Sequence, residues 1–490
     1  MRGAAAWAVV FSLTLAAHSA RAAVVETLRQ TGPADKRFNI AVLGDGYRAE
    51  DQMLLSKNAK AITDYLFEVS PLRQYAAFFN VKLVHVVSQD DGADNGSKGA
   101  TRDTALGAYF NCGGIDRLLC IDDGLVRVAA AEDVPEYNFA IVIVNDDKYG
   151  GSGGPICASS SNEQSFEVLA HEVGHSLARL ADEYDYEGNQ PPCDQQTDCA
   201  EANATIRTLR DRIKWRDWLE SSTPVPTPSS DQYDGVVGLF EGARYTPKGV
   251  YRPKRDCKMR NLGAAFCPVC TEQFMRSIWT ADNVQMVEAT SPAQPSVNVT
   301  TCEPVELSVT SPPIEPSTYR YTWKVDAELL TETSRIVSLL PGELQPGSHQ
   351  VSVAISDGTA MVRADPNGVL EDGFAWTVQV QRGDCPTMSG GTGGGAGSGG
   401  VHSGGTESGG VGAMGGGIAM SGAGSGGGAG AFAGGFAGAG TDGTSGGTPV
   451  PPSPPPSDSS GCGCSVPSTS KSMWPLSALA LAALRRRRRR

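Results

Sequence analysis

The chain has 490 residues, of which 41 are basic and 54 acidic, and its formal net charge at neutral pH is −13. This length allows two or three ordinary domains. An acidic chain is repelled by phosphate backbones and anionic lipid surfaces, so the composition argues against nucleic acid and membrane surfaces as partners.

The first 22 residues predict a secretory signal peptide. Arg2 precedes an apolar run from Ala4 to Ala17, and the sequence Ala20-Arg21-Ala22 matches a small-x-small cleavage site. The apolar run is too short to span a bilayer. We therefore expect an exported protein.

Residues 30–288 predict an α/β domain. Strands are expected at 38–43, 79–87 and 139–144, with a helix at 51–69. The last of these strands is continuously apolar, which is typical of a central position in a sheet. Strands that alternate with helices indicate a layered α/β sheet. A glycine-rich loop follows at 149–154, where a peptide substrate could add as an extra strand.

The turn Gly44-Asp45-Gly46 after the first strand has two interpretations. Its glycine spacing loosely matches a dinucleotide-binding loop, which would place a pyrophosphate at a helix N-terminus. Asp45 would repel that phosphate. A tight turn between strand and helix is therefore the favoured interpretation.

The run His171-Glu172-Val173-Gly174-His175 lies in an apolar segment that predicts a helix. Two histidines four residues apart project from the same helix face and can bind one Zn²⁺. The glutamate between them is placed to take a proton from a zinc-bound water. The alternative is an ordinary helix that carries two unrelated histidines.

A catalytic zinc usually keeps three protein ligands, so one more is required. The only other histidine of this region is His85, which favours a carboxylate: Asp182 first, then Glu183, then Glu241. In an unbroken helix Asp182 would lie about 10 Å along the axis from the second histidine. The helix must therefore end or turn near 178–180, although no glycine stands there.

Twelve cysteines in an exported chain suggest disulfides. Cys112 with Cys120 and Cys193 with Cys199 can each close a small loop. Cys302 and the cysteine at 385 bracket a later segment.

Four further cysteines, Cys157, Cys257, Cys267 and Cys270, fall in the catalytic region. Disulfides are the favoured interpretation because export favours oxidation. A structural zinc site is a second interpretation. A thiol-redox pair at Cys267-Pro268-Val269-Cys270 is a third, although no thioredoxin-like pattern surrounds it.

Beyond residue 290 the pattern changes to short strands separated by turn residues. Strands are expected at 305–309, 319–325, 348–355 and 374–380, and Trp323 lies between two cysteines. Residues 293–386 thus predict an immunoglobulin-like sandwich.

The rest of the chain predicts a tether and a sorting signal. Residues 387–461 are rich in Gly, Ser and Pro, which predicts a disordered spacer. Residues 462–490 combine Cys462-Gly463-Cys464, a short apolar run and six arginines. This tail resembles the myxobacterial class of C-terminal sorting signal, which implies attachment to the cell envelope or release after cleavage.

The region 38–280 resembles the M64 family of metallopeptidases, known for a member that cleaves IgA. The resemblance is carried by several short runs: Leu43-Gly44-Asp45-Gly46-Tyr47, Asn145-Asp146-Asp147-Lys148-Tyr149-Gly150-Gly151, the His171 to His175 run continued by Leu180-Ala181-Asp182-Glu183-Tyr184, Gly238-Leu239-Phe240-Glu241-Gly242-Ala243, Arg252-Pro253, Cys257-Lys258-Met259-Arg260 and Phe266-Cys267-Pro268-Val269-Cys270.

The resemblance implies a zinc endopeptidase with a metzincin-like fold, and it suggests Met259 as the methionine of a turn beneath the metal. Core packing is the alternative for Met259. The chain departs from the metzincin pattern at Ala178, where a glycine is usual, and at Ala181, where a ligand is usual.

The expected architecture is an α/β metzincin-like peptidase domain, an all-β sandwich and a disordered tether. Zn²⁺ held by His171, His175 and Asp182 would activate a water, with Glu172 as general base. Tyr184 or Tyr245 would donate a hydrogen bond to the oxyanion. The expected partner is a protein or peptide substrate. The competing classes are a surface adhesion protein with a structural zinc site and a thiol-redox protein.

Overall fold

The computed structural model describes residues 24–186, 193–340 and 342–384. The predicted signal peptide, spacer and sorting tail lie outside the described residues, as does the cysteine at 385. No helix among the described residues has both the length and the apolar character needed to cross a bilayer.

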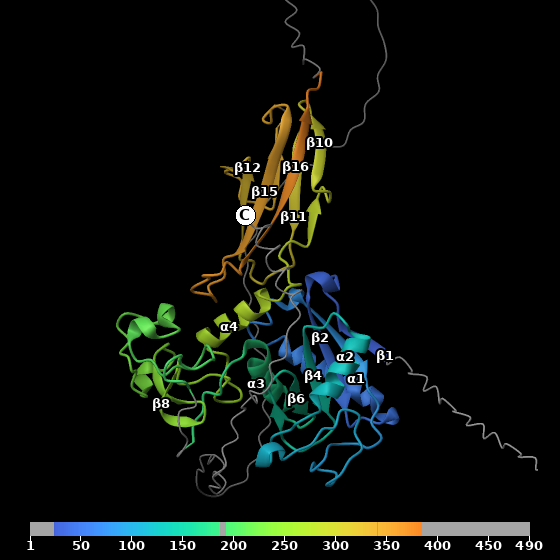
Figure 1. Cartoon of the computed structure of the whole chain (residues 1–490), viewed down its shortest axis with the longest axis vertical. Helices are drawn as coiled ribbons and strands as arrows, with labels where there is room; N and C mark the ends of the chain where they lie inside the picture. Colours follow the sequence, from blue (N-terminus) through green and yellow to red (C-terminus); the bar gives the residue numbers. More distant parts are fainter. Residues whose placement is uncertain (1–23, 187–192, 341, 385–490) are drawn as a thin grey trace, which may run out of the picture. The chain divides into compact units, whose positions relative to one another are not determined.

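The first part of the chain forms a six-stranded mixed sheet in the order β1-β3-β2-β4-β6-β5 (Figure 1). The strands β3, β2, β4 and β6 are parallel, whereas β1 and β5 run antiparallel at the two edges. The strand bounds are β1 Val24–Arg29, β2 Phe38–Asp45, β3 Phe79–His85, β4 Phe139–Val144, β5 Gly151–Ser152 and β6 Cys157–Ser160. The strands predicted at 38–43, 79–87 and 139–144 are confirmed.

Helices cover both faces of this sheet. Alternate residues of its central strands therefore belong to two different cores. In β4, Ile141 and Ile143 share a core with α1 and α3, whereas Val142 and Val144 share one with α2. A strand that is buried on both faces has no polar side, which explains its continuous apolar sequence. The helix bounds are α1 Gln52–Leu66, α2 Asp123–Asp133, α3 Ser165–Ala178 and α4 Pro268–Trp279.

The turn after β2 is held by the buried carboxylate of Asp45. Its Oδ1 accepts hydrogen bonds from the backbone N–H of Leu106 at 2.9 Å and from Ser88 Oγ at 3.1 Å, and its Oδ2 accepts one from Ala108 N–H at 2.9 Å. Gly46 has a φ of 69°, and a Cβ there would lie 2.1 Å from the carbonyl oxygen of Gly92. The carboxylate is thus engaged by the chain itself, in agreement with a tight turn.

The second part of the chain consists mostly of strands. Two sheets, ordered β10-β16-β15-β12-β13 and β14-β11-β9, contribute to one core in which the buried rings of Trp323 and Trp376 stack at 5.8 Å. The bounds are β9 Ala289–Ser291, β10 Ser296–Thr300, β11 Val305–Thr310, β12 Tyr319–Val325, β13 Glu328–Leu329, β14 Ile336–Leu339, β15 Gly347–Asp357 and β16 Glu371–Gln381. The four strands predicted here are present.

A two-stranded hairpin of β7 Phe240–Ala243 and β8 Thr246–Arg252 lies between α3 and α4 in the sequence. The two predicted small disulfides, Cys112–Cys120 and Cys193–Cys199, are present, and Cys302 is also disulfide-bonded. All described residues belong to one compact unit.

Replacement of Asp45 by alanine should destabilise the protein by about 2–4 kcal/mol, because it leaves three buried donors without their acceptor. The free energy of unfolding in urea measures this effect. Asp64→Ala is the matched control, since that exposed carboxylate on α1 only pairs with Lys60 and should contribute less than about 0.5 kcal/mol. Equal losses in the two variants would contradict this account of the turn.

Candidate metal centre

The helix α3 ends at Ala178, where the sequence requires a break if Asp182 is to return to the histidines. Arg179 adopts a left-handed conformation with a φ of 51°, and its N–H donates to the carbonyl oxygen of Gly174. Leu180 N–H donates to the same oxygen at 3.1 Å. A left-handed residue other than glycine costs about 1–2 kcal/mol, so other contacts have to stabilise this turn.

Asn203 supplies some of these contacts. Its side chain is fully buried, its Oδ1 accepts from Ala181 N–H at 2.8 Å, and its Nδ2 donates to Ala181 O at 2.9 Å. The same Nδ2 donates to Glu183 Oε1 at 2.9 Å. No sequence pattern identifies Asn203, because it is a lone asparagine in a loop.

Three ligand atoms converge beyond this turn. Asp182 Oδ1 lies 3.0 Å from His171 Nε2 and 3.2 Å from His175 Nε2, and the two Nε2 atoms are 3.2 Å apart. Tetrahedral zinc with bonds of about 2.0–2.1 Å would separate such atoms by about 3.3 Å. The donor set and its spacing therefore fit a zinc ion.

The other ring nitrogens fix the orientation of both imidazoles. His171 Nδ1–H donates to the carbonyl oxygen of Lys258 at 2.8 Å, and His175 Nδ1–H donates to that of Leu180 at 2.7 Å. A carbonyl can only accept, so each Nδ1 carries the proton and each Nε2 faces the centre.

The charges at the centre are strongly coupled. Burial opposes the charge on His175, but the adjacent Asp182 carboxylate outweighs it and raises the pKa of His175 to about 10. The pKa of His171 is also raised, because the hydrogen bond to Asp182 outweighs burial. Burial alone would raise the pKa of Asp182, but the two histidines hold it well below its usual range. Without a metal ion, the ionised Asp182 carboxylate is thus balanced by positive charge on the two histidine rings.

The β7–β8 hairpin holds Asp182 from the opposite side. Its turn residues Arg244 and Tyr245 both have positive φ, of 52° and 61°. Arg244 N–H donates to Asp182 O at 2.9 Å, and Tyr245 N–H donates to Tyr184 O at 3.0 Å. The Tyr245 hydroxyl donates to Asp182 Oδ2. From the sequence, Tyr245 is expected only as an oxyanion donor, and this contact with the Asp182 carboxylate was not predicted.

Tyr184 is largely buried in an aromatic group. Its ring lies 5.2 Å from that of Tyr245 and 5.7 Å from that of Tyr186. Burial and the Asp182 charge raise the pKa of Tyr184 far above its usual value. Its hydroxyl therefore stays protonated and can donate a hydrogen bond.

Glu172 lies on α3 between the two histidines and faces the glycine-rich loop. A Cβ on Gly153 would lie 3.0 Å from Glu172 Oε2 and 2.6 Å from His175 Cβ, so only glycine allows this close approach. Burial raises the pKa of Glu172, although the two histidines partly offset it.

The edge strand β5 is already partly paired. Leu119 N–H donates to Gly151 O at 3.3 Å, on a bridge between Leu118 and Gly151. An added substrate strand would therefore have to begin beyond Gly151.

The segment that contains Met259 passes beneath α3. A Cβ on Gly174 would lie 2.5 Å from Met259 Sδ, and Glu183 N–H donates to Met259 O at 2.7 Å. Met259 is fully buried. The glycine within the histidine motif thus allows the helix to rest on this side chain.

The other carboxylate candidates lie elsewhere. Glu241 accepts from Lys248 Nζ and from Gly249 N–H, both at 3.0 Å, and is not part of the histidine group. Glu183 faces Cys257, Cys267 and Cys270 instead. His85 contacts Gln52 and Glu26.

The expectation of disulfides among the four cysteines of this region is wrong. Cys157, Cys257, Cys267 and Cys270 are free, buried thiols. Cys257 Sγ and Cys270 Sγ are 3.7 Å apart, far beyond a disulfide bond of about 2.0 Å. Cys157 is also not part of the group that the other three form.

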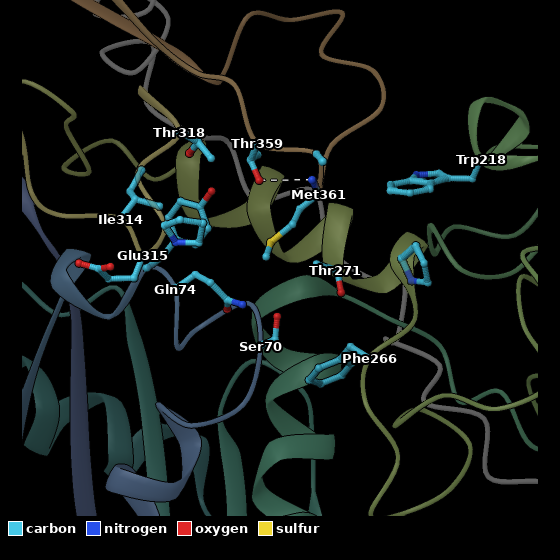
Figure 2. Close-up of a pocket in the computed structure, with 14 residues that line it drawn as sticks. Ser70, Gln74, Trp218, Phe266, Thr271, Ile314, Glu315, Thr318, Thr359 and Met361 are labelled. Atoms are coloured by element: carbon cyan, nitrogen blue, oxygen red, sulfur yellow. Dashed lines mark hydrogen bonds between the residues drawn. The ribbon is translucent and has the colours of Figure 1, made fainter. Parts of the chain in front are cut away.

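A pocket of about 460 Å³ has Phe266, Pro268 and Thr271, the sequence neighbours of Cys267 and Cys270, among its lining residues. Figure 2 shows Trp218, Phe266, Ile314 and Met361 around it, with Met361 N–H donating to Thr359 Oγ1 at 3.2 Å. None of the histidine or cysteine ligand candidates lines it. It is therefore separate from the candidate metal centre.

Comparison with known proteins gives one family. The sequence model of the family described as IgA peptidase M64 matches residues 26–234 and 229–278, which together cover more than half of the chain. No curated protein matches.

Solved structures give only weak likenesses. The fibronectin(III)-like modules of Clostridium thermocellum CbhA are 18% identical, over 18% of this chain and 92% of theirs, with a TM-score of 0.13. The Bacteroides ovatus protein SGBP-B, solved with a mixed-linkage heptasaccharide, is 15% identical over 18% of this chain and 20% of its own, with a TM-score of 0.14. The Thermotoga petrophila endo-beta-1,4-mannanase is 11% identical over 70% and 65%, with a TM-score of 0.14. These scores carry no argument about this chain.

Glu167→Gln should destabilise the segment that contains Lys258, whose carbonyl oxygen accepts the hydrogen bond from His171. The loss of stability should depend on pH. Glu167 accepts from Lys258 Nζ at 2.6 Å, from Gly263 N–H at 2.7 Å and from the Tyr65 hydroxyl. Burial alone would raise the pKa of Glu167, but these donors lower it below its ordinary value of 4.5. Its contribution to stability is therefore present above that value and is lost as the pH falls through the lower folded-state pKa.

At pH 7 the variant should be less stable by about 1–2 kcal/mol, and the difference should shrink at acidic pH. Unfolding in urea at several pH values measures this. Glu163→Gln, an exposed change just before the same helix, should show a difference within about 0.5 kcal/mol at every pH. A difference that stays constant down to strongly acidic pH would rule out the ionised pair.

Tyr245→Phe should weaken metal binding at the histidine group by about 10- to 100-fold, because it removes the donor that orients Asp182. Competition with a chelator of known affinity measures the change. The exposed neighbour Tyr186, whose ring stacks on Tyr245 at 6.0 Å, supplies the control Tyr186→Phe. Equal affinities in Tyr245→Phe and the wild type would show that the hydroxyl does not support the ligand.

Proposed function

Because the chain belongs to the M64 peptidase family, we propose that it is an exported zinc-dependent endopeptidase that uses Glu172 as its general base. Its substrates are proteins or peptides, as the activity of a peptidase family implies. The metal ligands in this proposal are His171, His175 and Asp182.

The observation that carries the proposal is the convergence of three ligand atoms beside a free carboxylate. Within the described residues, His171, His175 and Asp182 form a group whose ligand atoms all lie within 4.8 Å of one another. Glu172 lies on the same helix, between the histidines. A purely structural zinc site has no need of a base at this position.

A bound zinc ion would lower the pKa of a water molecule and polarise the scissile carbonyl. Glu172 would accept the proton of that water and deliver it to the leaving amine. Its raised pKa suits both tasks, because it brings the group closer to the pH at which it works. Tyr184 would donate a hydrogen bond to the developing oxyanion.

The chain also suggests how a substrate is held. The proposed substrate strand adds beyond Gly151, along Ser152 to Gly154, which brings its backbone against Glu172. Glycines at 151 and 153 let this loop lie directly against α3, since a Cβ at these positions would lie 2.6 Å from Val168 Cγ1 and from His175 Cβ, respectively.

The wider architecture is part of the proposal. We assign residues 30–288 to a metzincin-like peptidase domain, with Met259 as the methionine of the turn beneath the metal, and 293–386 to an immunoglobulin-like sandwich. The two small disulfides are typical of an exported protein. The assignments of 1–22 as a signal peptide, 387–461 as a spacer and 462–490 as a sorting signal rest on sequence alone.

Glu172→Gln should reduce the kcat/KM for cleavage of unfolded casein by about 10²- to 10⁴-fold while zinc content stays unchanged. The amide keeps the shape of the side chain but cannot accept the proton. Glu163→Gln, which precedes the same helix and is exposed, should leave the rate unchanged. Removal of metal with phenanthroline should abolish cleavage, and added zinc should restore it.

If the zinc-loaded wild type cleaves no substrate across a varied set, the peptidase proposal fails. If Glu172→Gln cleaves as fast as the wild type, the assignment of the general base fails.

A further inference from the structure

A second group of potential ligands lies behind the histidine group. It consists of Glu183, Cys257, Cys267 and Cys270, whose ligand atoms also lie within 4.8 Å of one another. Each of the four residues is at most 1% exposed. Free thiols at this depth cannot meet a protein substrate, so a role in the proposed proteolysis does not explain them.

The carboxylate of this group has one oxygen without a partner. Glu183 Oε1 accepts from Asn203 Nδ2, but Oε2 is buried and has no hydrogen-bond partner in the described part of the chain. A buried, unsatisfied carboxylate oxygen is costly. The oxygen nearest a thiol is Oε1, 3.3 Å from Cys270 Sγ, so a cation bound there would compensate the buried negative charge of this carboxylate.

The spacing of the ligand atoms fits a tetrahedral zinc ion. Zinc–sulfur bonds of about 2.3 Å place two sulfurs roughly 3.8 Å apart, and a sulfur and a carboxylate oxygen roughly 3.5 Å apart. The distance from Cys257 Sγ to Cys270 Sγ is 3.7 Å, and that from Cys270 Sγ to Glu183 Oε1 is 3.3 Å.

The local backbone favours thiolates. Cys267 is the N-cap of α4, Pro268 occupies its first turn, and Cys270 follows three residues later. The N-terminus of a helix stabilises negative charge. In addition, Cys267 N–H points at Cys257 Sγ at 3.2 Å, as a second shell around a metal-bound sulfur would.

Cationic groups balance the charge. Three thiolates, one carboxylate and a Zn²⁺ ion leave two negative charges. Arg260 donates to the carbonyl oxygen of Glu183 at 2.8 Å, and the buried Arg252 guanidinium lies close enough to act on the Glu183 charge. These two cations offset the excess.

We propose that Glu183, Cys257, Cys267 and Cys270 bind a second zinc ion in a closed, four-ligand structural site. Binding releases to solvent the protons that the four ligand side chains carry, and no electron transfer is involved. This inference does not depend on the proposed catalytic role of the histidine group.

The second site supports the first through the chain. Glu183 follows Asp182 directly, and Cys257 precedes Lys258, whose carbonyl oxygen orients His171. A zinc ion here would therefore fix both segments that hold the histidine group. It would take the place of the disulfides that the sequence predicts for these cysteines.

Zinc content of the full chain tests the proposal. The purified wild type should hold about two zinc ions, and His171→Ala/His175→Ala should keep about one. Cobalt added to that double variant should give thiolate-to-cobalt charge-transfer absorption. Cys267→Ser/Cys270→Ser should lose this second ion. The matched control is Cys157→Ser, a buried free thiol outside the group, which should keep both ions.

Thiol alkylation followed by mass spectrometry provides a second measurement. Cys257, Cys267 and Cys270 should resist alkylation in the native protein and react only after unfolding in the presence of a chelator. If Cys267→Ser/Cys270→Ser does not fold, Glu183→Gln replaces it, because the amide keeps the volume and the contact with Asn203 and should weaken zinc binding at this site at least tenfold.

Three results would overturn the proposal. One is a wild type with a single zinc ion that is lost in His171→Ala/His175→Ala. Another is cobalt absorption without a thiolate band in that variant. The third is a disulfide between any two of the three cysteines in the native protein, which would favour the thiol-redox interpretation. None of these results depends on proteolysis, so they are distinct from a failure of the catalytic proposal.

Discussion

The candidate metal centre depends on one reversal of the chain, the turn at Arg179 that brings Asp182 back to the helix it has just left. A straight α3 would carry the carboxylate about 10 Å away along its axis. The unfavourable left-handed conformation of Arg179 is offset from three directions: the histidine that donates to Leu180 O, the amide of Asn203 and the turn of the β7–β8 hairpin. Each of these groups is a proposed metal ligand or contacts Asp182 or a residue next to it. A mutation that weakens the turn should therefore also disturb the geometry of the metal centre.

Local patterns in the sequence were sufficient to predict β2, β3 and β4, the helices α1 and α3, and two histidines on one face of α3. They did not predict α2, α4 or the β7–β8 hairpin. The apolar run of β4 and the spacing of His171 and His175 each carry their own physical reason within a few residues. The need for a helix break before Asp182 also followed from helix geometry. The groups that make this break possible lie 20 to 80 residues further on, and no periodicity connects Asn203 or Lys258 to the helix. For the same reason Glu183 could not be separated from Asp182 by sequence: they are adjacent in the chain and face different groups of ligands.

The cysteines show the limits of an argument from compartment. Export favours disulfides, and it predicted the pairs that close loops of fewer than ten residues. It failed for Cys257, Cys267 and Cys270, because their backbones direct three sulfurs toward a carboxylate at distances too long for a bond between them. The distances between the sulfur atoms, rather than the redox state of the compartment, decide whether such thiols form disulfides.

The long-range contact between His171 and the carbonyl oxygen of Lys258 has a consequence for biosynthesis. All three proposed ligands are synthesised within twelve consecutive residues, but Tyr245 and Lys258, which orient Asp182 and His171, follow these ligands by 63 and 87 residues. A growing chain therefore holds ligands without their supports. The proposed metal centre would therefore be complete only after Lys258 has been synthesised and its segment has packed beneath α3.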